Sequence, residues 1–546
     1  MVWPRNDYKN ENYTNNTKLC LPVQLPSENE KFNNAHHKEL LPLLNPNRVR
    51  LTAQWIMISK ETATVKQLIK FLASGMNIVR LSYSLGPVSF LLELLKNIRQ
   101  AREEYSQQIG RYVPLAISTD DVGSVIQVGH FLKEKEYFPK GHQVICTEDI
   151  AFFHKSNRDY LYIGLKNMHV VLSPGNKINI DFDAVVLAVD GVVGTNIVCT
   201  VELGGYLTSR VKVIIFGTHV SSSKFSAEDF KALSFAVKNN LDIFCPSSIE
   251  NAEDVLHIRK KIKTLGGNIA IVPKIDNWEG VCNIDSILPV VDGVFVGRGY
   301  LGYTIGWRKV PIVQKSLISK ANISGTPICV LGQFVTEMAT QVTPTYAEVG
   351  DVANLAMDGG SSLMTHSETT TGKYPTEVCK VLDRCLKIGE LGFFYKRHFR
   401  DVLKTVKVPT YITDAIAISA VLASYVCLAS TIICITQSGK TAQLLSKYFP
   451  RCSILAVTRK LDTVNQLQLC RAVVPLYYRK PRLDNWCCDM EKRLEYGIQF
   501  AAETGITKDG DPIILLHPGK PGSTITSTVR IVISPTIQTS IVPEIE

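Results

Sequence analysis

Short hydrophobic runs recur through the first two-thirds of the 546-residue chain, and amphipathic stretches separate them. Within each continuous part, the separating stretches have helix length, for example 252–265 and 346–358. Strands that alternate with helices eight times are typical of a parallel (β/α)8 barrel. The eight runs that we interpret as strands are 55–59, 77–81, 115–119, 242–246, 269–275, 293–298, 327–332 and 362–367.

The third and fourth of these runs are too far apart to be joined by a single helix. Between them, residues 124–223 contain short β-type runs with turn signals, which predicts an all-β domain inserted into a barrel loop. After about residue 391 a second strand–helix alternation begins, with strands that include 431–436, 453–458 and 512–516. The predicted parts are an N-terminal segment (1–47), a barrel in two pieces (48–123 and 224–391), the inserted β domain (124–223) and a C-terminal α/β domain (392–546).

Residues 415–436 carry no charge and are long enough to cross a bilayer. The first part of this segment is rich in Ala and Ser, as in a packed helix, whereas 431–436 is rich in β-branched residues and is followed by Gln437-Ser438-Gly439. A helix followed by a buried strand fits this change of pattern better than a membrane span.

Composition narrows the possible function classes. The net charge of +10 suits a protein that handles phosphorylated anions, but no dense Lys/Arg run with interleaved aromatic residues points to nucleic acid. The 14 cysteines include no C-x-x-C pair, and the polar N-terminus lacks the apolar stretch of a signal peptide. We therefore expect a cytoplasmic protein in a reducing compartment, with no nucleic-acid or membrane partner.

Polar residues gather at the C-terminal ends of the predicted barrel strands, where barrels of this kind carry their chemistry. A site for phosphate and metal needs basic groups and a cation to offset phosphoryl charge. A set of structural ion pairs at the barrel rim is an equally open interpretation. The residues concerned are Arg80, Asp120, Lys274, Asp276, Arg298, Gly332 and His366.

Two glycine motifs match parts of nucleotide-binding patterns. Residues 297–302 fit G-x-G-x-x-G after a strand, but no acidic residue occurs between Gly302 and Glu337 to bind a ribose. Residues 437–441 contain Gly-Lys-Thr, but the first glycine of a full phosphate loop would fall at Cys434. This turn between a strand and a helix is either an anion cradle of backbone N–H groups or an ordinary turn.

Five ordered motifs resemble the pyruvate kinase family. Residues 73–84 resemble "GMNxxRLNFS", and the others are 271–280 ("SKIEN..EG"), 292–302 ("DGIMVARGDLG"), 344–354 ("PTRAEVSDVAN") and 364–375 ("MLSGETAKGDYP"). The match runs from about Arg48 to Ser534. The resemblance implies the architecture already predicted and glycolytic phosphoryl transfer from phosphoenolpyruvate to ADP, giving pyruvate and ATP. It also implies Mg²⁺ or Mn²⁺, K⁺ and a tetramer.

The resemblance assigns roles to residues that match the family pattern. Arg80 takes the place of the arginine on the substrate phosphate, and Lys274 that of the catalytic lysine that stabilises the enolate and the transferring phosphoryl group. Gly299 is the matching substrate-binding glycine. Ser84 and Asp120 match ligands of the monovalent cation, although an expected Asn is Ser82 and an expected Thr is Asp121. Glu368 matches the glutamate of the last barrel loop.

Other positions depart from the family. The divalent-metal glutamate is replaced by the shorter Asp276, and the metal-binding aspartate by Tyr300, whose neutral phenol is a poor magnesium ligand. Losing a metal ligand removes stabilisation of the transferred phosphoryl charge, so we expect doubtful divalent binding and weakened or lost activity. The further replacements are Gly332 for Thr, His366 for Ser, Val122 for Lys, Gln127 for Arg and Leu85 for His.

The C-terminal domain keeps more of the family pattern. The turn at 436–441 resembles the loop that holds a phosphate of a sugar-bisphosphate effector, and Lys520 lies near the arginine position of the closing loop. The predicted effector residues are Thr436, Ser438, Gly439, Lys440, Thr441, Trp486 and Arg493. Two hypotheses follow: a weakly active kinase, for which the resemblance implies a homotetramer, or an inactive member that binds a sugar phosphate or assembles with an active paralogue. A nicotinamide dehydrogenase is a distant third.

Overall fold

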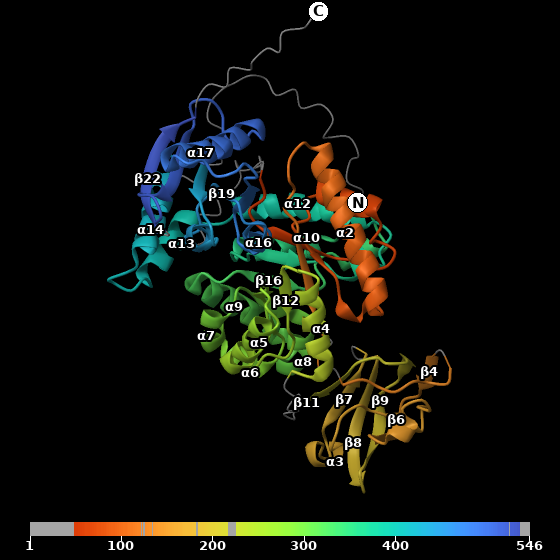
Figure 1. The fold of residues 1–546 in the computed structure, drawn as a ribbon. Coiled ribbons are helices and arrows are strands. Elements are labelled where there is room, and N and C mark those ends of the chain that lie inside the picture. The colour runs from red at the N-terminus through yellow and green to blue at the C-terminus, as the bar shows by residue number, and fades with distance from the viewer. Residues whose placement is uncertain are drawn as a thin grey trace, which may run out of the picture.

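The computed structural model describes residues 49–121, 123, 126–133, 135–181, 184–216, 225–523 and 525–534. The predicted segment 1–47 and the positions Arg48 and Val122 lie outside these residues. The described chain has three parts, with a barrel in the middle, a β-strand domain on one side and an α/β domain on the other (Figure 1).

A curled parallel sheet forms the barrel, in the order β13-β12-β3-β2-β1-β17-β16-β15-β14. Its ends, β13 and β14, are consecutive in the chain, so the sheet closes on itself. The strands are β1 (Ala53–Met57), β2 (Ile78–Arg80), β3 (Ala116–Asp120), β12 (Ile243–Cys245), β13 (Ala270–Ile271), β14 (Lys274–Ile275), β15 (Val294–Gly297), β16 (Ile328–Leu331) and β17 (Ser362–Met364). The predicted parallel barrel is confirmed.

The fifth predicted strand, 269–275, is divided into two by Val272 and Pro273. Pro273 has no N–H group to donate, but its carbonyl accepts from the Phe295 N–H at 2.8 Å. On the other side, the Val272 N–H donates to the Phe244 carbonyl at 2.9 Å. The division therefore interrupts the strand without opening the barrel.

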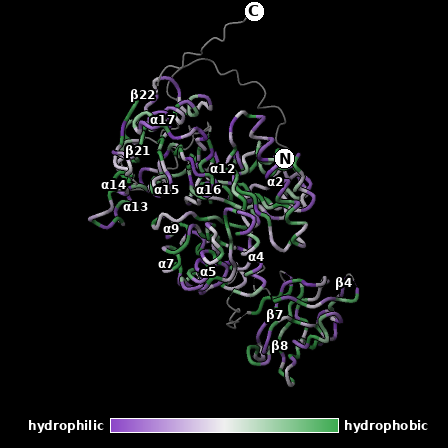
Figure 2. Tube along the Cα trace, in the orientation of Figure 1, coloured by the Kyte–Doolittle hydropathy of each residue, from purple (hydrophilic) through white to green (hydrophobic). Residues whose placement is uncertain are grey.

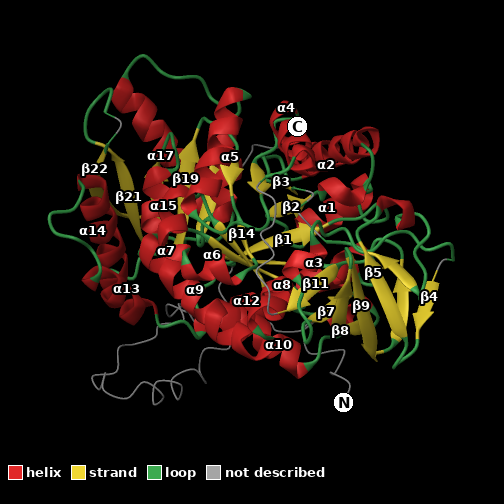
Figure 3. Cartoon of the chain, turned by 90° about the horizontal axis from the view of Figure 1, so that it is seen from below, coloured by secondary structure: helices red, strands yellow, loops and turns green. Residues whose placement is uncertain are grey.

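Helices surround the barrel strands, which occupy the centre of Figure 3. Several begin with strong caps: Ser226, Asn251 and Thr345 each form a capping box with the acidic residue three positions later. The helices are α1 (Val65–Ala73), α2 (Val88–Gln108), α4 (Ala227–Lys238), α5 (Ala252–Thr264), α6 (Trp278–Cys282), α7 (Ile284–Ile287), α8 (Arg298–Ile305), α9 (Val310–Ser324), α10 (Tyr346–Met357), α11 (Ser367–Thr370) and α12 (Pro375–Leu391). Short 3₁₀ turns are η2 (Tyr83–Leu85), η4 (Leu288–Val290), η5 (Trp307–Lys309) and η6 (Thr336–Ala339).

The inserted segment forms β-sheets, as predicted for an added sheet domain. A six-stranded sheet has the order β11-β7-β8-β9-β5-β6, and β10 pairs with β4. Buried residues alternate mainly with half-buried ones along β8 and β9, which gives this part its own core. The elements are β4 (Lys135–Phe138), β5 (Gln143–Thr147), η3 (Ile150–Phe152), β6 (Tyr160–Tyr162), α3 (Met168–Val171), β7 (Lys177–Ile180), β8 (Val185–Val193), β9 (Asn196–Leu203), β10 (Gly205–Thr208) and β11 (Val213–Phe216).

The C-terminal part is a five-stranded sheet in the order β20-β19-β18-β21-β22, in which only β22 is antiparallel to its neighbour. Its strands are β18 (Thr431–Ile435), β19 (Ser453–Thr458), β20 (Val473–Tyr477), β21 (Pro512–Pro518) and β22 (Thr526–Ile533). Its helices are α13 (Tyr395–Lys404), α14 (Ile412–Val426), α15 (Lys440–Lys447), α16 (Leu461–Gln466), η7 (Leu467–Leu469) and α17 (Trp486–Glu503).

The uncharged segment 415–436 is divided between helix α14 and buried strand β18, as its pattern predicted. Within the described residues, no helix is both long and apolar enough to cross a membrane. Hydrophobic stretches occur in all three parts of the chain (Figure 2), and each part has a buried cluster of its own.

Candidate functional site

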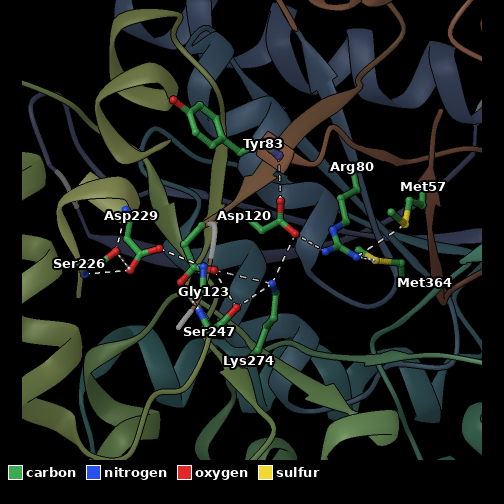
Figure 4. Close-up of polar contacts among 11 residues, drawn as sticks. Met57, Arg80, Tyr83, Asp120, Gly123, Ser226, Asp229, Ser247, Lys274 and Met364 are labelled. Carbon is green, nitrogen blue, oxygen red and sulfur yellow. Dashed lines mark hydrogen bonds and ion pairs between the residues drawn. The ribbon is translucent and has the colours of Figure 1, made fainter. Parts of the chain in front are cut away.

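A network of ion pairs joins three barrel strands at their C-terminal ends. The Arg80 guanidinium at the end of β2 pairs with the Asp120 carboxylate at the end of β3. The Lys274 ammonium in β14 lies 3.4 Å from the same carboxylate and donates to the Ser247 hydroxyl at 3.0 Å. Figure 4 shows these groups pointing toward one another. Three residues predicted from sequence are therefore brought together.

Asp120 carries the negative charge that pairs with both cations of this network. Burial alone disfavours its charge, but Arg80 and Lys274 outweigh burial and hold the pKa of Asp120 well below its usual range. The Tyr83 N–H donates to its second oxygen at 3.1 Å. Asp120 is thus ionised at neutral pH and is already engaged by two cations.

Arg80 has capacity left for a ligand. It is almost fully buried, and among the described residues its Nη1 contacts only the sulfur atoms of Met364, at 3.6 Å, and Met57, at 3.8 Å. Its buried Nε has no hydrogen-bond partner among the described residues. Because sulfur is a weak acceptor, an anion at this position would give Arg80 stronger partners.

Asp121 adds a second carboxylate behind Lys274. Its two oxygens accept from the Ser247 N–H at 2.6 Å and the Ser247 hydroxyl at 2.7 Å. The Lys274 ammonium lies 3.9 Å away. Burial raises the pKa of Asp121, and Lys274 and the Ser247 hydrogen bonds partly oppose that rise.

The two positions expected to hold a divalent metal do not offer a matching ligand set. Desolvation raises the pKa of Asp276 to about 6, against the opposing effect of Lys274. The hydroxyl oxygen of Tyr300 is buried and has no hydrogen-bond partner in the described part of the chain, and desolvation raises the pKa of this phenol. Tyr300 is therefore neutral. No group of three or more His, Cys, Asp or Glu among the described residues is arranged to hold a metal ion.

Lys212 of the inserted β domain reaches the barrel mouth and covers Tyr300. Its ammonium lies 4.7 Å from the centre of the Tyr300 ring, within the range of a cation–π contact. Desolvation lowers the pKa of Lys212, and the nearby charges of Lys274 and Arg80 lower it further. Gln127, where the family arginine was expected, forms an antiparallel bridge with Lys212.

The glycine and arginine that follow β15 lie on α8. Arg298 pairs with Asp351 at 2.6 Å, donates to the Gly332 carbonyl, and lies 4.1 Å from the centre of the Phe334 ring. Arg298 is thus part of a structural ion pair at the rim. Gly299 is exposed beside Tyr300, which places the predicted substrate-binding glycine at the same helix start.

The remaining predicted positions surround the mouth. Desolvation lowers the pKa of His366, and Arg80 and Lys212 add to the effect, so this imidazole is neutral at pH 7. Burial raises the pKa of Glu368 on α11. Ser84 is exposed and Leu85 half-buried in η2, next to the Tyr83 N–H that binds Asp120.

The predicted effector turn joins β18 to α15. Gly439 adopts φ +81° as the N-cap of α15, and its N–H donates to the Thr436 hydroxyl at 2.9 Å. Ser438 and Lys440 are exposed on the same turn, whereas the buried Thr441 hydroxyl hydrogen-bonds to Thr526 at 2.8 Å. Three of the four hydroxyl or backbone groups predicted for phosphate binding, those of Thr436, Gly439 and Thr441, are therefore engaged within the protein.

Trp486 and Arg493 lie on α17. Arg493 makes a long contact of 3.5 Å with the Val457 carbonyl, and its buried Nε has no partner among the described residues. Desolvation lowers the pKa of Arg493 to about 10, and Arg459 adds to the effect. Trp486 is half-buried at the first turn of the helix.

Sequence reasoning missed Lys212 and Ser247. Ser247 lies two residues beyond the end of β12, so its place at the strand terminus was a usable signal. Lys212 comes from another domain, and nothing in the barrel motifs indicates which residue of the insertion reaches the mouth.

The comparisons with known proteins cover both main parts of the chain. Residues 50–379 match the family "Pyruvate kinase, barrel domain", and residues 414–532 match "Pyruvate kinase, alpha/beta domain". Pyruvate kinase PKLR of Homo sapiens is 34% identical over 89% of this chain and 85% of its own length. Pyruvate kinase of Candida albicans is 36% identical over 87% of this chain and 94% of its own length. The two matching domains occur in the expected order, and the rim of the closed barrel carries the ion pairs of Arg80, Asp120 and Lys274. This chain therefore belongs to the pyruvate kinase family.

Proposed function

We propose that this chain binds the phosphorylated substrate of its family but transfers its phosphoryl group to ADP only weakly or not at all. The observation that carries the proposal is Tyr300. A neutral phenol lies where the family places a metal-binding carboxylate, and the Lys212 ammonium covers its ring. A cation already at this place opposes the approach of a second one.

The retained groups support binding of an anion. Arg80 has donors without strong partners, and Lys274 lies next to it across Asp120. Lys212 adds a third cation at the mouth. Three cations around one opening attract a phosphate ester, and burial strengthens their hydrogen bonds to it.

The reaction of the family also requires stabilisation of the negative charge that develops on the enolate oxygen, away from the phosphate. When the phosphoryl group leaves phosphoenolpyruvate, an enolate oxygen remains, and Lys274 is the cation positioned to stabilise it. The enolate carbon must then take a proton. Gly332 offers no hydroxyl, and His366 is neutral and could donate a proton only after taking one up. Mg²⁺ or Mn²⁺ supplies charge stabilisation in this family, but the residues present do not fit it, and we derive no step through it.

A coupled assay of pyruvate formation on the purified protein, with Mg²⁺ or Mn²⁺ and K⁺, tests the proposal. We expect a rate at least about a thousandfold below that of active relatives, because a metal supplies several kcal/mol to phosphoryl transfer and about 1.4 kcal/mol is tenfold in rate. A rate close to that of active relatives would contradict the proposal.

Tyr300→Asp tests the cause. It restores a carboxylate beside Asp276 and removes the ring under Lys212, so we expect residual pyruvate formation to rise at least about tenfold. Tyr300→Phe is the matched control, since it keeps the ring and removes only a hydroxyl that has no partner; it should leave the rate unchanged. Equal rates in both variants would place the defect elsewhere.

A regulatory role is the second candidate, favoured by the retained turn at 436–441. The exposed Lys440 and Ser438 stand at the start of α15, where backbone N–H groups and the helix dipole favour an anion. On this proposal the chain binds a sugar bisphosphate and assembles as a homotetramer or with an active paralogue. Size measurement of the purified chain, alone and mixed with an active relative, distinguishes the two assemblies.

A further inference from the structure

A second cleft lies between the barrel and the C-terminal domain. It has a volume of about 740 Å³ and is lined by the C-terminal end of α2, residues 110–112, the end of β20 and α17. Residues 110–112 precede β3, so the cleft lies toward the N-terminal ends of the barrel strands, opposite the mouth. Its volume is within the range of small-molecule pockets, about 300–1,000 Å³.

Cations outnumber acids in this cleft. Four of its lining residues are basic, namely Arg102, Arg111, Arg479 and Lys480, and two are acidic, Glu103 and Glu503. Within the described part of the chain, none of the four cations forms an ion pair with a carboxylate. The cleft therefore carries positive charge that the protein itself does not neutralise.

Aromatic rings hold the arginines instead. The Arg111 guanidinium lies 4.7 Å from the centre of the Phe500 ring, and Arg479 lies 5.4 Å from Tyr112 and 5.6 Å from Tyr477. The centres of the Tyr112 and Tyr477 rings are 5.2 Å apart. A guanidinium on a ring face keeps its edge N–H groups free to bind an anion. Rings and guanidinium planes are also the surfaces on which nucleic-acid bases stack.

We propose that this cleft binds a nucleoside monophosphate. The phosphate takes the edge N–H groups of Arg111 and Arg479 and the ammonium of Lys480, and the planar base stacks on the Tyr477 side of the cleft. The ribose hydroxyls donate to Glu103 or Glu503, which accept only. Each of the three chemical features of the cleft, cationic, aromatic and acidic, then has a partner on one ligand. The site touches both the barrel and the C-terminal domain.

Calorimetric titration of the full chain with the four common nucleoside monophosphates tests the proposal, with the matching nucleosides and inorganic phosphate as separate ligands. At least one monophosphate should bind. Its nucleoside and inorganic phosphate should each bind at least about tenfold more weakly, because a hydrogen bond to a charged group contributes roughly 1.5–3 kcal/mol. Failure of all four to bind overturns the proposal, and equal binding of inorganic phosphate overturns recognition of the base and ribose.

Variants locate the binding site. Arg479→Gln should weaken binding at least about tenfold, because it removes an exposed cation without removing core packing. Arg158→Gln is the matched control, since Arg158 is an exposed arginine of the inserted β domain, and it should bind as the wild type does. Lys274→Met should also leave this binding unchanged. If Lys274→Met abolishes binding and Arg479→Gln does not, the ligand occupies the barrel mouth and the proposal is wrong; pyruvate formation is not needed for any of these outcomes.

Discussion

At the scale of single residues, Gly332 limits how the threonine hydroxyl of the family can be restored. Its φ of +116° is one that side chains with a Cβ atom rarely adopt, although an added Cβ would meet no atom within 4 Å. Gly332→Thr would return the family hydroxyl, but we expect the backbone strain to cost about 1–3 kcal/mol. The measurement is the Tm of the variant together with its rate of pyruvate formation.

Two alanine variants separate strain from the effect of the hydroxyl. Gly332→Ala should lose about as much stability as Gly332→Thr, because any Cβ meets the same backbone strain. Gly350→Ala, in α10, should instead keep or raise Tm, since this glycine is helical and an added Cβ there meets nothing. An unchanged Tm in Gly332→Thr would show that the loop relaxes freely.

The residues of the site could be predicted from sequence only where chemistry and strand position coincide. Arg80, Asp120 and Lys274 stand at strand termini, and the barrel brings their charges together. Lys212 could not be predicted, because the contact depends on how the inserted domain lies against α8 rather than on any local pattern. Arg298 looked like a ligand group from its position, but Asp351 and the Gly332 carbonyl hold it in the structure.

At the scale of elements, Asp242 couples the barrel to the C-terminal domain. It precedes β12, accepts from the Ile117 N–H at 2.8 Å, and accepts from Asn465 of α16 at 2.9 Å. Burial raises its pKa from 3.8 to about 6. Because its pKa is higher in the folded state, the folded state binds the proton more tightly than the unfolded state does. The contribution of Asp242 to the free energy of unfolding is therefore fully present below about pH 4 and is lost as pH rises through 6.

Asp242→Asn should therefore gain stability relative to the wild type as pH rises from 4 to 7. The shift of about two pKa units limits the relative gain to roughly 3 kcal/mol. Tm of both proteins is measured across this range. Asp285→Asn, on an exposed carboxylate, is the control and should show no such trend. A constant difference between wild type and Asp242→Asn would contradict the ionisation of a buried Asp242.

The turn between β18 and α15 is a second element whose role can be tested. Gly439 needs its φ of +81°, and an added Cβ would lie 3.1 Å from Leu467. We expect fructose 1,6-bisphosphate to bind the wild type in a calorimetric titration. Lys440→Gln should weaken that binding about tenfold, since it removes one charge-assisted contact. Lys447→Gln, in the last turn of the same helix, should not.

Elements could be predicted more completely than residues, because periodicity is a local property. The eight barrel runs all contain strands, and the change from an Ala-rich to a β-branched pattern at 415–436 corresponds to α14 and β18. The exception is the run 269–275. Its hydrophobic pattern is continuous, and only Pro273, which has no N–H group, divides it into β13 and β14.

At the scale of the whole molecule, the inserted β domain completes the barrel mouth through Lys212. Desolvation and the charges of Lys274 and Arg80 disfavour the Lys212 ammonium there, and the Tyr300 ring compensates in part. An anion at the mouth would reverse this balance, because it attracts all three cations at once. Binding of phosphoenolpyruvate should therefore hold the inserted domain more firmly against the barrel.

Lys212→Met tests this coupling between domains. The methionine keeps an apolar contact with the Tyr300 ring but removes the charge, so phosphoenolpyruvate should bind about tenfold more weakly. Lys177→Met removes an exposed lysine of the same domain and should bind as the wild type does. Small-angle scattering should show a smaller radius of gyration when phosphoenolpyruvate is added to the wild type, and a weaker response in Lys212→Met. If Lys212→Met and Lys177→Met bind phosphoenolpyruvate equally, the charge of Lys212 does not contribute to binding. The position of the inserted domain against the barrel then depends on the contact with Tyr300 alone.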